Sequence, residues 1–237
     1  MEDRSLVRVG AGFGLVGALI ATVANLLHPR TPEEADTVWF GVIADSSLWN
    51  FVHFLIGVAI LFVLAGLVAL ARYVRDSPGS GWGTITLIFG ITGAAVALVH
   101  TGVDGFAVKH VAERWAEAGS PNEGAIYELI QAMDAISNGL FNVFNGTLLG
   151  IVPVLGGIAA LRSGLFPGWV GVVAIIGGAI GIALDVYATL GGELTPFVAN
   201  AVLTAGALLA TIWAIAINWT MFSAAGEPAE VGEARTA

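Results

Sequence analysis

Three histidines and one aspartate have the chemistry of a metal site. His28, His53 and His100 lie toward the same end of three apolar segments. Asp104 follows His100 by four residues, which puts the two side chains on one helix face, where the carboxylate can orient the imidazole. Neutral imidazoles with an open coordination position bind zinc and activate water. The predicted site has the three histidines as ligands of zinc or a similar divalent metal, with Asp104 beside them.

The same residues also allow interpretations without a metal. Asn, Asp and His side chains hydrogen-bond spanning helices to one another in many non-catalytic proteins, and this is the interpretation we favour. A b-type haem held by two of the histidines is the least favoured. The fourth histidine, His110, lies beyond the apolar segment and is rotated by roughly 80° from His100 on an ideal helix. We expect it to face solvent.

Further polar side chains gather toward the histidine end of the apolar segments. Such groups are costly in a bilayer, so they indicate contact with the helix bundle or with a water-filled cavity. One helical stripe has successive spacings of 4, 4 and 3 residues, beginning at Asp134. We predict an outward-facing polar vestibule lined by Asn25, Asn50, Asp104, Asp134, Asn138, Asn142, Asn145 and Asp185.

Six apolar segments must position these residues. The chain has 237 residues, of which 57% are hydrophobic and 11% charged, whereas a soluble domain carries about 25% charge. A spanning helix needs about 20 mostly apolar residues. We predict an all-α, six-transmembrane-helix bundle over 1–223, a multi-pass protein of the cell (plasma) membrane. The predicted spans are about 9–27, 50–71, 83–103, 136–161, 169–190 and 197–222.

The basic residues and the connections predict the topology. More Arg and Lys flank the ends opposite the histidines than the histidine ends. Because cytoplasmic loops carry the excess of basic residues, we expect both termini in the cytoplasm. Segments 29–49 and 104–135 have helical patterns and are expected to form an outer cap. Residues 224–237, rich in Gly, Glu, Pro and Ala, are expected to be a disordered cytoplasmic tail.

Composition and glycine spacing exclude several classes. There is no cysteine for a disulfide or a thiolate metal site, and the net charge of -9 argues against nucleic acid. Gly10, Gly12, Gly14 and Gly17 superficially match a dinucleotide-binding fingerprint, but they lie in an apolar helix rather than after a strand. We expect them to permit close helix packing.

Short motifs near the helix ends resemble a broad group of uncharacterised six-helix integral membrane proteins of actinobacteria and haloarchaea. The motifs are Asn25-Leu-Leu-His28-Pro29, Trp49-Asn-Phe-Val-His53 and Arg162-Ser-Gly-Leu-Phe-Pro167-Gly-Trp169. The resemblance implies the six-helix plan and no particular activity.

Three classes of function remain after these exclusions. The favoured one is a non-enzymatic structural, accessory or ligand-sensing unit with an outward-facing polar vestibule. The second is a metal-dependent membrane hydrolase with a His-rich outer-leaflet site, and the third is a transporter or channel subunit. The expected partners are the lipid bilayer, a lipid-like or small-molecule ligand from the outer side, and a second copy of the chain in a homo-oligomer.

Overall fold

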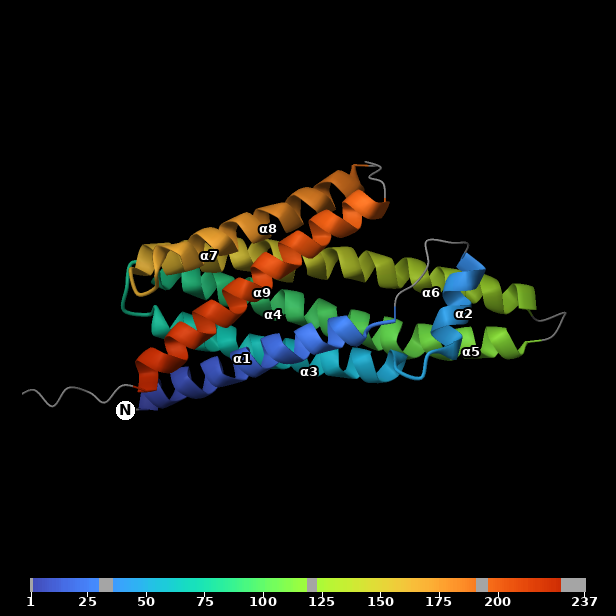
Figure 1. Cartoon of the computed structure of the whole chain (residues 1–237), viewed down its shortest axis with the longest axis horizontal. Coiled ribbons are helices and arrows are strands. Elements are labelled where there is room, and N and C mark those ends of the chain that lie inside the picture. Colours follow the sequence, from blue (N-terminus) through green and yellow to red (C-terminus); the bar gives the residue numbers. More distant parts are fainter. Residues whose placement is uncertain (1, 30–35, 119–122, 191–195, 227–237) are drawn as a thin grey trace, which may run out of the picture.

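The computed structural model describes residues 2–29, 36–118, 123–190 and 196–226. These residues form α-helices and two π-helical turns, with no strand among them (Figure 1). The elements are α1 (Glu2–Leu27), α2 (Asp36–Asp45), α3 (Trp49–Tyr73), α4 (Ser80–Gly102), η1 (Val103–Val108), α5 (Lys109–Glu117), α6 (Glu123–Phe144), η2 (Asn145–Ile151), α7 (Val152–Ser163), α8 (Gly168–Thr189) and α9 (Pro196–Gly226).

Six helices in the described part of the chain are long and apolar enough to cross a membrane, which confirms the predicted fold class. Two of them are longer than expected, because α4, η1 and α5 run on as one helix of 38 residues, and α6, η2 and α7 run on as another, of which Gly124–Ser163 makes up 40 residues. At 1.5 Å per residue each is about 57–60 Å long, nearly twice a hydrocarbon core of about 30 Å. Their joined ends therefore extend past the other helices, at the right of Figure 1.

Some predicted boundaries need correction. The predicted spans at 83–103 and 136–161 lie inside the two long helices. Helix α9 continues to Gly226, so the first residues of the predicted tail are helical, while 227–237 lie outside the described residues. The start of α1 lies beside the end of α9, since a Cβ added at Gly226 would lie 3.4 Å from the guanidinium carbon of Arg8. Which side of the membrane this end faces stays a prediction.

Helix α2 packs on the projecting end of the two long helices and shares a small apolar core with them. The fully buried members of this core are Phe40, Ile43, Trp49, Val108, Ala112 and Ile130. Lys109 fastens the packing, because its ammonium group donates to the carbonyl oxygens of Ile43 (2.9 Å) and Ala44 (2.6 Å) at the end of α2. A cation there also suits the negative end of the helix dipole. We call α2, α5 and the first half of α6 the cap.

Glycines let the spanning helices approach closely, as expected for Gly10, Gly14 and Gly17 but not for Gly12. A Cβ at Gly10 of α1 would lie 2.8 Å from the backbone oxygen of Ala65 in α3. Gly14 of α1 and Gly66 of α3 face each other, and the buried Asn218 side chain of α9 fills the space between them. Helices surrounded by lipid tails have no hydrophobic driving force to associate, so the short distance between the helix backbones contributes directly to stability.

Substituting Gly10→Ala is expected to lower the free energy of unfolding by about 1–3 kcal/mol, because the added methyl group meets a backbone atom that cannot move aside. Thermal unfolding in detergent measures the change. Gly12→Ala is the matched control on the same helix, where the nearest atom would be 3.6 Å away. Equal destabilisation by both substitutions would contradict the packing argument.

Candidate functional site

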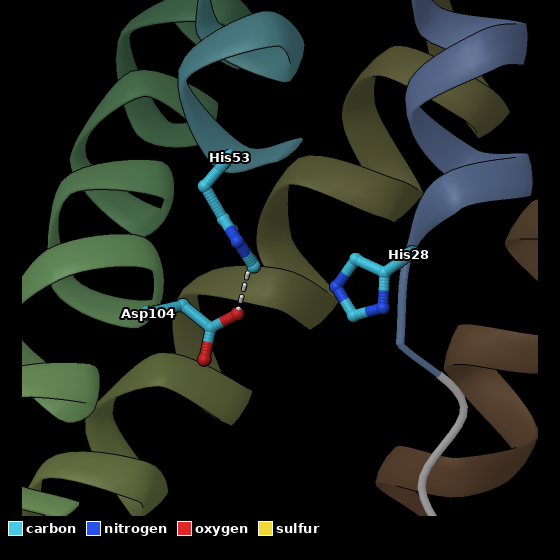
Figure 2. Close-up of side chains that lie close together, drawn as sticks. All are labelled: His28, His53 and Asp104. Carbon is cyan, nitrogen blue, oxygen red and sulfur yellow. Dashed lines mark hydrogen bonds and ion pairs between the residues drawn. The ribbon is translucent and has the colours of Figure 1, made fainter. Parts of the chain in front are cut away.

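Three side chains from three segments converge where the cap meets the bundle. His28 lies just after α1, His53 in the first turns of α3, and Asp104 in the π-helical turn η1 (Figure 2). One possible ligand atom from each residue lies within 4.8 Å of the other two. The His53 side chain is 3% exposed and that of Asp104 is 14% exposed. We call these three residues the His–Asp cluster.

Both ring nitrogens of His53 face oxygen atoms. Nδ1 lies 2.7 Å from the carbonyl oxygen of Trp49, which can only accept, so Nδ1 carries a hydrogen and donates it. Nε2 lies 2.7 Å from Oδ2 of Asp104. A neutral imidazole has one N–H, so two lone pairs would face each other at this second contact. The contact therefore requires a proton shared by the pair, or a metal ion in its place.

His28 completes the cluster with a nitrogen that can accept. Its Nδ1 donates to the carbonyl oxygen of Pro29 at 3.0 Å, and Figure 2 shows its other ring nitrogen turned toward His53 and Asp104. Burial lowers the pKa of His28, and the adjacent His53 ring lowers it further. The hydrogen bond to Pro29 and the charge of Asp104 oppose that shift without cancelling it. The lowered pKa favours the neutral form of His28, which is the form that binds metals.

Two neighbours hold the cluster in place. Trp49 is fully buried, and its indole N–H donates to the backbone oxygen of Asp104 at 2.9 Å. Its ring also contacts both histidines, with centroid distances of 4.9 Å to His53 and 5.1 Å to His28. Gly105 lets η1 approach α3, because a Cβ at this position would overlap the Cβ of His53. Trp49 and Gly105 therefore fix the His53–Asp104 distance.

The third predicted metal ligand, His100, lies outside the cluster. Its Nδ1 is 3.2 Å from both the backbone oxygen and the hydroxyl of Ser137, and its ring packs on Phe141 and Phe144. The expected pairing of His100 with Asp104 assumed α-helical geometry through position 104, whereas the helix becomes π-helical at Val103. The Asp104 carboxylate bonds to His53 instead. His110 is exposed, as expected.

The eight residues of the predicted vestibule lie in several places. Asp104 belongs to the cluster, while Asn145 and Asp185 line a separate small pocket. Asn138 donates to the Asp134 carboxylate at 2.9 Å on the surface of α6. The other three are exposed, and they are Asn25, Asn50 and Asn142. A single vestibule stays a prediction.

Sequence reasoning missed three residues that shape the site. Trp49 precedes His53 by four residues, so helical spacing was available as a signal for their contact. Lys109, the only lysine in the chain, is 6% exposed and holds the cap; a lone lysine in so apolar a sequence was the available signal. No local pattern signalled the role of Gly105, since that role depends on contact with His53, which is 51 positions from the neighbouring Asp104.

No protein-family model matches this chain, and neither a curated protein nor a solved structure is significantly similar to it.

Gly105→Ala is expected to destabilise the protein by about 1–3 kcal/mol, because the new methyl group pushes η1 away from His53. Thermal unfolding in detergent measures the loss. Gly102→Ala, one turn earlier, is the control, since an added Cβ there meets nothing within 4 Å. An unchanged midpoint in the Gly105 variant would show that the close approach is not required.

Proposed function

We propose that the protein is an integral membrane protein that binds a divalent transition-metal ion, with zinc the best fit, through His28, His53 and Asp104. The observation that carries the proposal is the convergence of three donor atoms within 4.8 Å of one another. Its class is that of a ligand-binding or ligand-sensing unit of the membrane. The metal binds at the cap end of the bundle.

The donor set fits zinc in type and in number. Two imidazole nitrogens and a carboxylate oxygen are ligands that zinc binds at about 2.0–2.2 Å, so tetrahedral ligands stand about 3.3–3.5 Å apart. The His53–Asp104 contact of 2.7 Å has to open slightly and the His28 ring to move inward slightly. Both histidines donate their Nδ1 hydrogen to a carbonyl oxygen. That arrangement orients a metal-binding imidazole and leaves Nε2 for the metal.

The metal would replace a proton. Without it, the contact between His53 and Asp104 requires a shared proton, because both ring nitrogens of His53 lie 2.7 Å from oxygen atoms, one of Trp49 and one of Asp104. Metal binding would then release that proton, and binding would weaken as the pH falls. A proton alone, holding the helices together, is the competing interpretation, and it predicts no metal.

A metal-dependent hydrolase is the second candidate. Three protein ligands leave the fourth tetrahedral position for water, which is typical of catalytic rather than structural zinc. The partial exposure of Asp104 favours an open position of this kind. The transporter or channel alternative stays a prediction from the sequence.

Purified protein is expected to bind about one zinc per chain, as measured by elemental analysis and by calorimetric titration of protein stripped with a chelator. His28→Ala and His53→Ala remove a ligand and should abolish stoichiometric binding, and Asp104→Asn should weaken it by roughly 10–100-fold or more.

His100→Ala and His110→Ala are matched controls, since each removes a histidine outside the cluster. Both should keep the metal. Protein that binds no zinc although correctly folded, or binding that persists in the His53 variant, would refute the proposed function.

Cobalt(II) substitution is expected to separate binding from catalysis. If the fourth position holds exchangeable water, azide should displace that water and change the visible absorption bands of the cobalt. If azide leaves the absorption bands unchanged, the metal has no exchangeable water ligand, and the hydrolase candidate would then be wrong.

A further inference from the structure

The three residues of the His–Asp cluster lie where the chain passes between the bundle and the cap. His28 follows the end of α1, and the next described element along the chain is α2. His53 lies in α3, one turn after Trp49, the residue with which that helix begins on leaving the cap. Asp104 lies in η1, which leads from α4 into α5 (Figures 1 and 2). The remaining passage lies within α6, so a possible metal ligand stands at each of the others.

Trp49 connects the interior of the cap to all three residues. It belongs to the apolar core that α2 shares with the long helices, and its ring packs on Trp39 of α2 at a centroid distance of 5.8 Å. The same ring packs on both histidines. Its indole N–H donates to the backbone oxygen of Asp104, and its carbonyl oxygen accepts from His53. Because close-packed interiors transmit strain, the cap cannot leave the bundle without disturbing the cluster.

Asp104 is also coupled to the cap through its own helix. Val108, the last residue of η1, is buried in the apolar core of the cap, and Lys109 follows it as the first residue of α5. The Lys109 ammonium group donates to the carbonyl oxygens at the end of α2. Metal binding requires the 2.7 Å contact between His53 and Asp104 to open to about 3.3–3.5 Å. Such a shift moves the part of η1 and α5 to which α2 is fastened.

We propose that the metal ion regulates the cap, which stays closed on the bundle while the ion is bound and opens more often when the ion is absent. The proposal rests on the proposed metal site, since it assigns a consequence to the occupancy of that site. An ion bonded at three passages of the chain has to lose a ligand before those passages separate. The open fraction of the cap therefore falls by the factor 1 + [metal]/Kd, and the closed cap in turn binds the ion more tightly.

The test is hydrogen–deuterium exchange of the full chain in detergent, measured by mass spectrometry with zinc at about 100 times its Kd and again with a chelator. Helix α2 holds none of the three ligands, so coordination cannot protect its amides directly. We expect zinc to slow exchange in α2 by up to about 100-fold, because local exchange follows the open fraction. Exchange in the turn between α7 and α8, at the opposite end of the bundle, should stay unchanged (Figure 1). Mg²⁺, which prefers oxygen ligands, should not replace zinc.

Three variants separate the metal from the packing of the cap. His53→Ala removes a ligand and should abolish the effect of zinc on α2. His110→Ala removes an exposed histidine of α5 and should keep the effect. Lys109→Met removes the bonds to α2 but no ligand, so α2 should exchange faster with and without zinc, and zinc should still slow it. This variant brings the openings into range if the unmodified cap opens too rarely to measure.

The proposal on the cap and the proposed function fail in different ways. If about one zinc binds per chain but exchange in α2 is unchanged in both the unmodified protein and Lys109→Met, the metal site stands and the proposal on the cap is wrong. If no zinc binds, both are wrong. If zinc slows α2 equally in His53→Ala, the ion acts from another place and the proposal is overturned.

Discussion

Close contact between helix backbones is the constraint on which this bundle depends. Helices in lipid gain nothing from burying apolar surface against one another, so contact distance and interhelical hydrogen bonds determine whether they associate. Gly10 and Gly14 bring α1 onto α3, and Gly157 and Gly171 bring α7 onto α8, where each Cβ would meet the backbone oxygen of the other residue. The His–Asp cluster follows the same rule at Gly105. The glycines that pack the bundle and the glycine that brings Asp104 to His53 therefore act by one mechanism.

The chemistry lies where the helices depart from α-helical geometry. Among the described residues there are two π-helical turns, and each carries a polar side chain directed at another helix. Asp104 lies in η1 and contacts α3, whereas Asn145 begins η2 and faces the pocket beside α8. Single π-helical turns inside α-helices are frequently functional. In this protein they place polar side chains within two long apolar helices.

The sequence was sufficient for the helices and insufficient for their contacts. Hydropathy alone predicted six spans, because each apolar segment is long enough to cross a bilayer. The positions of His28, His53 and Asp104 relative to those spans also indicated that the three residues share one end of the bundle. The predicted ligand His100 lies outside the observed cluster and Asp104 lies inside it, and a spacing of four could not indicate the change to π-helical geometry at Val103. Which helices are neighbours depends on glycine contacts that no local pattern encodes, and so the contact of His53 with Asp104 could not be predicted.

The single lysine of the chain gives the cap an intrinsic chemical reporter. Lys109 is buried, and its ammonium group is held by two carbonyl oxygens of α2 and by Glu113 at 3.1 Å. An amine-reactive reagent reaches this nitrogen only after α2 has moved away from α5. The rate of acylation at this one position therefore counts the openings of the cap in an unmodified protein, with no label to introduce and no competing lysine to subtract.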